Sequence, residues 1–352
     1  MALRLTGTTL KTSTPAIALD PSAITASSLA RQAETTLQRG DVDGYAGLFD
    51  QADGHSEPPR RFEARLALLD AGIRSTRFVT AGQATRIFVS VADRALEMLE
   101  QEPAEPTVLN LAGVALYELW SLDAAQVLFK SARRLDPSLP EAERNLVQLA
   151  QRRRQAGRRA RPLHAAAPAL ASRARVVAKR AQPARGLTLS LCMIVRDEEQ
   201  MLPRCLAAAA PFVDEIVVVD TGSNDATIEI ARSFGARVIE HAWTGSFSDA
   251  RNVSFEAATG DWLIYLDADE VLTEADGPRL RALTGRTWRE AFYLVETSYL
   301  GELGDGAAMV NNALRIFRNR PAYRFKDRLH EQIWHTLPAY VPGRLEQTAV
   351  RV

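Results

Sequence analysis

The sequence contains few of the residues that cross-link small folds or hold structural metals. Its 352 residues include two cysteines, Cys192 and Cys205, and neither belongs to a C-x-x-C or zinc-type spacing. A disulfide framework is therefore not expected, and a reducing compartment fits the chain well. The chain has no run of about 18 apolar residues, and residues 1–21 lack the apolar core of a signal peptide. We expect a cytoplasmic protein that meets a membrane, if at all, at the surface of its inner face.

The chain also lacks net charge, with 43 basic and 43 acidic residues. The charge is unevenly distributed, however, because residues 151–186 carry eleven basic residues and no acidic one. Because this tract is rich in Ala, Pro and Arg, we predict a linker that is partly helical at most. A solvated spacer and docking onto anionic lipid headgroups both stay open. The tract has no aromatic residue to stack on bases, which argues against a nucleic-acid partner.

The N-terminal half contains the pattern of a helical repeat. Residues 1–27 are rich in Thr, Ser, Ala and Pro and are predicted to be disordered, whereas 28–150 show helical periodicity. One segment resembles a tetratricopeptide repeat, in which small residues let two antiparallel helices approach and a proline ends the second. Its residues are Leu109, Ala112, Gly113, Leu116, Ala125, Phe129, Ala132 and Pro137. An ordinary helical hairpin is the alternative, and either would bind a protein partner and perform no chemistry.

From residue 187 to 352 the pattern changes to strands alternating with helices. The expected strands are 187–195, 215–219, 237–240 and 262–266, and the expected helices between them are 199–210, 226–234 and 248–258. Short strand–helix–strand units predict parallel strands joined by right-handed crossovers. We therefore predict an αβα sandwich with a mostly parallel sheet, preceded by an all-α domain.

Carboxylates follow the strands of this predicted sheet where ligands bind in such folds, beyond the carboxyl ends. Asp197 follows one strand, Asp220 ends the next, and Asp267 and Asp269 follow a third. Residues two apart along an extended segment point the same way, so Asp267 and Asp269 can face one divalent ion. Mg²⁺ or Mn²⁺ binds through one or two carboxylates together with substrate phosphates. The sequence therefore predicts a metal-assisted diphosphate site at this edge.

Four motifs together resemble the family 2 glycosyltransferases. They are residues 192–199 (CMIVRDEE), 218–225 (VVDTGSND), 250–252 (ARN) and 266–270 (LDADE), in that family's order and spacing. The resemblance covers about 150 residues of this chain. It implies the GT-A fold, an αβα sandwich that binds a nucleotide-sugar donor and a divalent ion. A UDP-sugar is the expected donor, and a saccharide, a lipid-linked saccharide or a protein is the expected acceptor.

The same resemblance implies roles for individual positions. The nucleotide-sugar contacts would be Arg196, Asp197, Glu198, Asp220, Arg251, Asn252 and Asp267, and the metal ligands Asp267 and Asp269. Many relatives have Asn where Asp197 stands. An inverting transfer needs a carboxylate to take the acceptor proton, and Glu331, in a His-Glu-Gln segment typical of a subgroup, is the candidate base. His330 would assist the metal or diphosphate.

The sequence leaves other functions open. Relatives usually continue past the end of this chain with another strand, so the domain is expected to be truncated at its C-terminus. A non-catalytic scaffold, with helical repeats and a degenerate nucleotide-binding domain, is therefore one alternative. Asp267 could instead be the nucleophile of a haloacid-dehalogenase-like phosphatase. That fold, however, normally puts its motif on the first strand, and two strand–helix units precede Asp267 here.

Overall fold

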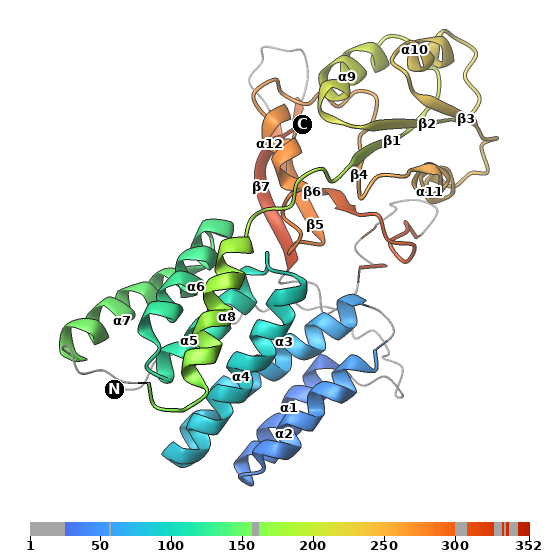
Figure 1. Cartoon of the computed structure of the whole chain (residues 1–352). Helices are drawn as coiled ribbons and strands as arrows, with labels where there is room; N and C mark the ends of the chain where they lie inside the picture. Colours follow the sequence, from blue (N-terminus) through green and yellow to red (C-terminus); the bar gives the residue numbers. More distant parts are fainter. Residues whose placement is uncertain are drawn as a thin grey trace.

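The computed structural model describes residues 25–55, 58–156, 162–299, 308–326, 333, 336–337 and 344–352. Its described part forms a helical region followed by an α/β domain, which lie beside each other along the molecule (Figure 1). Nearly all of the predicted disordered segment 1–27 lies outside the described residues, and so do both His330 and Glu331. Within the described part, no helix is both long and apolar enough to cross a bilayer.

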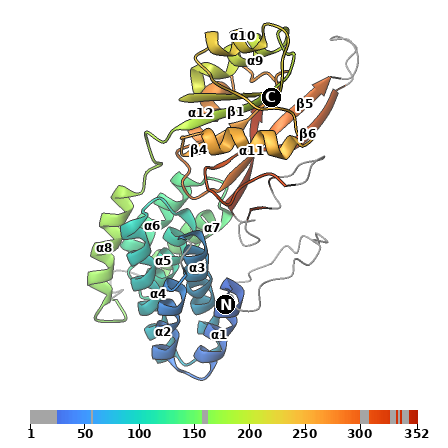
Figure 2. The ribbon, with the colours of Figure 1, turned by 90° about the vertical axis from the view of Figure 1, so that its right-hand side faces the viewer.

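The helical region is built of antiparallel helices that share one hydrophobic core. The helices are α1 (Ala26–Gln38), α2 (Val42–Asp53), α3 (Pro58–Ser75), a short 3-10 turn η1 (Thr76–Phe78), α4 (Ala81–Gln101), α5 (Pro106–Glu118), α6 (Leu122–Leu135) and α7 (Pro140–Ala156). Threonines begin two of these helices, because the Thr25 and Thr80 side chains each accept a hydrogen bond from the third residue of the helix that follows. Consecutive helices lie side by side in both ribbon views (Figures 1 and 2).

Helices α5 and α6 form the hairpin that the repeat pattern predicts. A Cβ added at Gly113 would lie 2.5 Å from Cε1 of Phe129, so the two helices approach closely only because residue 113 has no side chain. Leu116 and Phe129 are fully buried between the helices. Helix α6 ends at Leu135, just before Pro137. Small residues on one helix thus accommodate an aromatic ring on the other, as the sequence suggests.

The basic tract differs from the predicted linker. Helix α7 continues to Ala156, and residues 167–180 form a further helix, α8 (Ala167–Arg180), packed on α4 and α6. Leu170, Ala174 and Val177 of α8 are buried in the helical core. Three arginines of the tract pair with acidic side chains of the preceding helices: Arg152 with Glu118, Arg153 with Asp123, and Arg173 with Asp93 and Glu100. Composition suggested a spacer because these acidic partners lie far away in the sequence.

The α/β domain follows the predicted alternation closely. Its elements are β1 (Leu189–Val195), α9 (Leu202–Ala209), η3 (Ala210–Phe212), β2 (Glu215–Asp220), α10 (Thr227–Ser233), β3 (Arg237–Glu240), α11 (Phe247–Ala257), β4 (Trp262–Tyr265), α12 (Gly277–Leu283), β5 (Ala291–Tyr299), β6 (Ala308–Arg318) and β7 (Leu345–Arg351). Gly235 ends α10 with a φ of 78°, a conformation that favours glycine. The strand β7 was not predicted.

The sheet has the strand order β3-β2-β1-β4-β6-β5-β7. Strands β3, β2, β1 and β4 are parallel to one another, β6 is antiparallel to both β4 and β5, and β7 is parallel to β5. Helices α9, α10 and α12 contribute to the core on one face, and α11 to the core on the other. The predicted αβα sandwich with a mostly parallel sheet, preceded by an all-α region, is therefore confirmed.

The two regions share a buried interface. Trp288 of the α/β domain is part of the hydrophobic core of the helical region. Arg344, which precedes β7, pairs with Glu63 of α3 at 3.0 Å, with Glu105 at 2.9 Å and with Glu290 at 3.2 Å. Arg289 likewise contacts Asp136 at 2.7 Å. Apolar contact and buried ion pairs thus join the helical region to the sheet edge formed by β5 and β7.

Candidate functional site

An open cleft of about 810 Å³ lies at the carboxyl ends of the central strands. It is lined by residues from β1, β2, the β3–α11 loop, α11 and the segment after β4: Ile194, Val195, Arg196, Glu198, Met201, Thr221, Trp243, Phe247, Arg251, Asp267, Ala268 and Asp269. This is the sheet edge at which ligands bind in parallel α/β folds. Its size is within the range of small-molecule sites.

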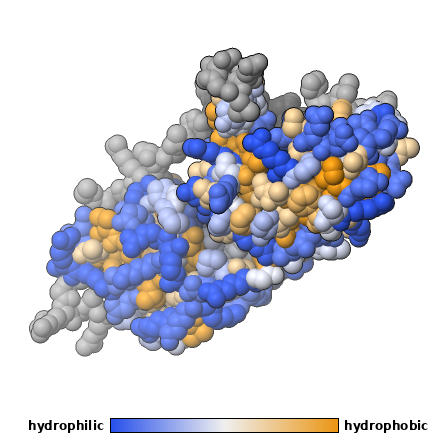
Figure 3. Space-filling view, turned by 90° about the horizontal axis from the view of Figure 1, so that it is seen from above, coloured by the Kyte–Doolittle hydropathy of each residue, from blue (hydrophilic) through white to orange (hydrophobic). Residues whose placement is uncertain are grey.

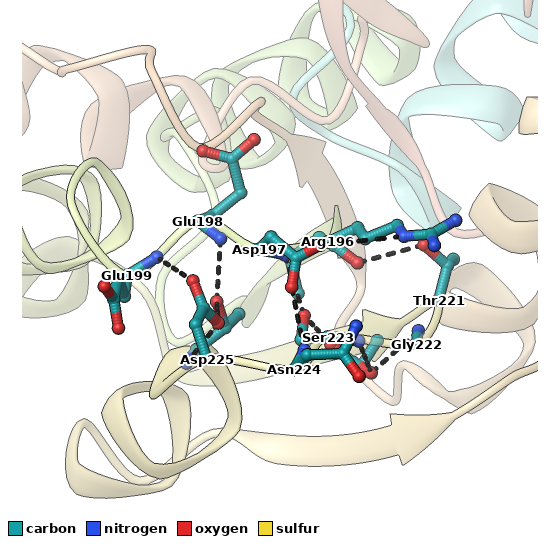
Figure 4. A network of polar contacts seen from close by, with 12 residues as sticks. Arg196, Asp197, Glu198, Glu199, Thr221, Gly222, Ser223, Asn224 and Asp225 are labelled. Atoms are coloured by element: carbon teal, nitrogen blue, oxygen red, sulfur yellow. Dashed lines mark hydrogen bonds and ion pairs between the residues drawn. The ribbon is translucent and has the colours of Figure 1, made fainter.

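The loops after β1 and β2 are held together by their own polar groups (Figure 4). The Asp197 backbone N–H donates to Ser223 Oγ at 2.9 Å, and Asp197 Oδ1 accepts from the Asn224 N–H at 2.7 Å. Asp197 has a φ of 53°, a left-handed conformation that aspartate tolerates better than most residues. One oxygen of Asp197 is therefore engaged in fixing the neighbouring loop.

The next two residues of this loop repeat the arrangement. The backbone N–H of Glu198 donates to Thr227 Oγ1 at 2.7 Å, and that of Glu199 donates to Asp225 Oδ2 at 3.1 Å. The Glu198 side chain points away from this network (Figure 4) and lines the cleft. Burial, and then the charge of Asp269, raises the pKa of Glu198 above its ordinary value. Glu198 therefore contributes negative charge to the same space as the carboxylates after β4.

Asp220 is buried, with 2% of its surface exposed, and it organises the turn after β2. Its Oδ2 accepts from the Gly222 N–H at 2.9 Å and from the Ser223 N–H at 3.0 Å, and its Oδ1 accepts from the Ser223 hydroxyl. Gly222 has a φ of 107°, which this tight turn requires. In this conformation Thr221 lines the cleft while Asp220 lies beneath it.

Asp267 is oriented by Arg251 of α11. Arg251 Nη2 lies 2.7 Å from Asp267 Oδ1, and the guanidinium lies 5.0 Å from the centroid of the Tyr265 ring. Burial raises the pKa of Asp267, but the charge and hydrogen bond of Arg251 together with the charge of Arg315 outweigh burial and leave this pKa below its ordinary value. The Ala-Arg-Asn motif and the Asp-x-Asp motif are therefore joined by a direct contact between Arg251 and Asp267, which the sequence did not predict.

A second buried arginine also supports the Asp-x-Asp segment. Arg315 of β6 pairs with Glu270 and, at 3.2 Å, with Glu296 of β5. Glu270 Oε2 in turn accepts from the Asp267 backbone N–H at 2.9 Å. Burial, partly offset by Arg315, raises the pKa of Glu270 to about 7. Both oxygens of Glu270 are thus engaged in holding the segment.

Sequence reasoning missed Arg315 and Glu296 as members of this site. The signal that could have found Arg315 is its position between the apolar residues Leu314 and Ile316. Asn252, a predicted position, and its neighbour Asp249 have supporting roles. Asn252 exchanges two hydrogen bonds with the backbone of Phe325, at 2.9 and 3.0 Å. Asp249 accepts from Thr244 at 2.8 Å and contacts His241 at 3.0 Å, which orders the β3–α11 loop.

The residues after β4 could hold a divalent ion only with help from a ligand. Asp267 and Asp269 both line the cleft. Among the described residues, no group of three or more His, Cys, Asp or Glu side chains is placed to bind a metal ion. Two carboxylates beside an open cleft fit the coordination habit of Mg²⁺ and Mn²⁺, because a diphosphate and water can supply the remaining oxygens.

Three large apolar side chains at this cleft were also missed. Met201, Trp243 and Phe247 line it and are exposed by 50%, 39% and 40%, respectively. Hydrophilic residues cover much of the surface seen in Figure 3, with apolar patches among them. Trp243 was not found from the sequence because it lies between β3 and α11, outside the four motifs.

A protein-family model matches the part of the chain that holds the cleft. Residues 190–320 match the family model described as glycosyl transferase family 2. A TPR repeat-containing protein of Synechococcus elongatus is 43% identical over 151 residues, which are 43% of this chain and 36% of that protein. The SPbeta prophage-derived glycosyltransferase SunS of Bacillus subtilis is 26% identical over 156 residues, 43% of this chain and 36% of that protein. The chain therefore spans about a third of the length of these relatives.

Among solved structures, similarity extends to the glucosyl-3-phosphoglycerate synthase of Mycobacterium tuberculosis in complex with phosphoglyceric acid. The identity is 18% and the TM-score 0.38, over 47% of this chain and 71% of that chain.

Proposed function

We propose, on the premise that residues 190–320 form a family 2 glycosyltransferase domain, that this chain transfers a sugar from a nucleotide-diphosphate donor to an acceptor. The observation that carries the proposal is the pair Asp267 and Asp269 in the cleft, with Asp267 oriented by Arg251. An isolated Asp-x-Asp sequence is common after strands. Here the segment is instead braced by two buried arginines, Arg251 and Arg315, on separate elements.

Within this proposal, Asp269 contacts a Mg²⁺ or Mn²⁺ ion and Asp267 contacts the ion and the donor ribose. The ion, when bound, neutralises the diphosphate leaving group. Arg251 keeps Asp267 ionised and oriented, and its guanidinium lies in the cleft wall near the expected phosphates. Arg196, Asp197, Glu198, Asp220 and Asn252 belong to the donor pocket: Arg196 and Glu198 line it, whereas the other three hold its loops.

The acceptor proton needs a base in a transfer with inversion. Glu270 is unsuited to this role because both of its carboxylate oxygens are already engaged. We therefore retain Glu331 as the proposed base and His330 as its neighbour at the diphosphate. A Glu331→Gln variant should bind nucleotide like wild type and lose turnover.

The donor nucleotide is proposed to be UDP, and the acceptor a saccharide, a lipid-linked saccharide or a protein. The proposed location is the cytoplasm, with a protein partner held by the helical region. Membrane contact through residues 151–186 has less support than the sequence suggested, because Arg152, Arg153 and Arg173 are paired with acidic residues of the chain itself.

Calorimetric titration tests the proposal. UDP, GDP and dTDP are titrated with and without Mn²⁺ into wild type, Asp269→Asn and the control Asp43→Asn, an exposed aspartate of the helical region. Metal-dependent binding of one nucleotide, weakened only in Asp269→Asn, supports the enzyme. If no nucleotide binds to wild type, the proposal fails and the scaffold alternative takes its place.

A further inference from the structure

Part of the cleft lining is apolar and has no role in the proposed binding of metal and diphosphate at Asp267 and Asp269. The Trp243 and Phe247 rings meet edge to face, with centroids 4.9 Å apart and planes at 67°. Both rings remain well exposed although they touch each other, and Met201 lies exposed in the same cleft. Large apolar side chains gathered around a concave site are typical of places where a flat or apolar ligand packs.

The two rings are not needed to order their own loop. Ser246 begins α11 by accepting a hydrogen bond from the Asp249 N–H at 3.3 Å. Asp249 in turn binds Thr244 and His241, which fixes the path of the chain between β3 and α11. Polar contacts therefore shape the loop, and the exposed faces of the aromatic rings are left for another partner.

The order of the strands places these rings at the nucleoside end of the cleft. Trp243 follows β3, whereas Asp267 and Asp269 follow β4, and the order β3-β2-β1-β4 separates the two strands by three spacings. Neighbouring strands lie about 4.8 Å apart, so the separation across the sheet is about 14 Å. On the far side of β4 lie β6 and β5, with Arg315 and Glu296. The cleft lining extends from Asp267 and Asp269 to Trp243, so a donor with its diphosphate at Asp269 can place its nucleoside toward β3.

We propose that Trp243 and Phe247 form a stacking platform for the nucleobase of the donor. This inference rests on the proposed function and adds the residues that bind the base. Stacking on an aromatic ring accepts any base, because every base has a π-face. The platform therefore supplies affinity, and discrimination between bases must come from hydrogen-bonding groups elsewhere in the pocket.

Titration of ring variants tests the platform. The variants are Trp243→Ala, Phe247→Ala and Trp243→Phe, with Phe78→Ala as control, because Phe78 is 65% exposed and lies in the helical region, away from the cleft. The probes, all with Mn²⁺, are UDP and inorganic pyrophosphate, which lacks the base. Trp243→Ala should weaken UDP binding by roughly tenfold, given that base stacking is worth about 1–3 kcal/mol. Pyrophosphate binding should be unchanged, and Trp243→Phe should retain most of the UDP affinity.

Each other outcome has a distinct meaning. In one outcome, wild type and Phe78→Ala bind UDP, and Asp269→Asn lowers the UDP affinity. If Trp243→Ala and Phe247→Ala then leave the UDP affinity unchanged, the platform is overturned and the proposed function stands. If Trp243→Ala weakens a UDP-sugar but not UDP, the rings pack against the sugar, and the base assignment is overturned. If wild type binds no nucleotide, both proposals fail together. Circular dichroism verifies that each variant is folded, and the exposure of both rings makes folding of the variants the expected result.

Discussion

Arg251 Nη2 and Asp267 Oδ1 lie 2.7 Å apart, and this contact joins two motifs that are separate in the sequence. Because Arg251 lowers the pKa of Asp267, the carboxylate stays ionised at a pH where an ordinary aspartate begins to take up a proton. Metal-dependent nucleotide binding should therefore persist toward acid in wild type.

Arg251→Met should remove this protection. The pKa of Asp267 then rises, and nucleotide affinity should fall by about tenfold at neutral pH, because a charge-assisted contact is worth about 1.5–3 kcal/mol. As the medium is acidified from about pH 6 to 4, the UDP affinity of Arg251→Met should begin to fall further at a higher pH than that of wild type. The measurement is the UDP dissociation constant, with Mn²⁺, across that range. Arg251→Lys keeps the positive charge, so its UDP affinity should lie between those of wild type and Arg251→Met. Superposable pH profiles for Arg251→Met and wild type would show that Arg251 does not keep Asp267 ionised.

Arg315 should matter for stability as much as for activity. Replacing it with Met leaves Glu270 and Glu296 without their cation in a buried site, which typically costs about 3–5 kcal/mol. The measurement is the free energy of unfolding from urea titration. Arg86→Met is the control, because Arg86 and Asp43 form an exposed pair whose loss should cost about 0–1 kcal/mol. Equal costs for the two variants would show that Arg315 does not brace the Asp-x-Asp segment.

The strands and helices that lead to the site could be predicted because their signals are local. The bounds of β3 agree with the expectation, and those of β1, β2, β4 and α11 differ by at most two residues. Each of these strands is buried over nearly all its length or bounded by a turn, so its hydrophobic pattern and the turn-forming residues at its ends are enough to locate it. The strand β7 was missed because residues 345–351 alternate weakly, and only pairing with β5 makes them a strand.

The supporting contacts of the site could not be predicted, since they join residues far apart in the chain. Asp220, a predicted nucleotide contact, is covered by the turn it organises. Arg315 reaches Glu270 from another strand, and Arg173 of the supposed linker reaches Asp93 and Glu100. Composition reports how many charges a segment carries and says nothing of which distant groups neutralise them.

The ion pairs between the two regions should make stability depend on pH. Burial, partly offset by Arg344, raises the pKa of Glu105 from 4.5 to about 7, with the charges of Glu102 and Glu63 adding to the rise. A carboxyl whose pKa is raised in the folded state contributes stability that is present below about pH 4.5 and lost as pH rises through about 7. The melting temperature should therefore fall between about pH 4.5 and 7 in wild type and level off above that range, by calorimetry, and fall less in Glu105→Gln.

Glu143→Gln is the control for this prediction. Glu143 is exposed on α7 and pairs with Arg133, away from Glu105 and Arg344, so its replacement should leave the pH dependence of wild type nearly intact. A Glu105→Gln variant whose melting temperature falls with pH as steeply as that of wild type would contradict the assignment.

Gly113 should tolerate no side chain at the contact between α5 and α6. A side chain there meets the Phe129 ring, with Cε1 2.5 Å from the added Cβ, so Gly113→Val should overpack the α5–α6 contact and cost about 1–3 kcal/mol. Gly47 of α2 is the control, because an added Cβ there meets nothing within 4 Å, and Gly47→Ala should stabilise the chain by about 0.5–1 kcal/mol. Phe129→Leu combined with Gly113→Val should recover part of the loss, since a smaller partner makes room. Additive effects in the double variant would show that the two residues are not in contact, against the hairpin geometry. The measurement is urea unfolding of Gly113→Val, Phe129→Leu, the double variant and Gly47→Ala.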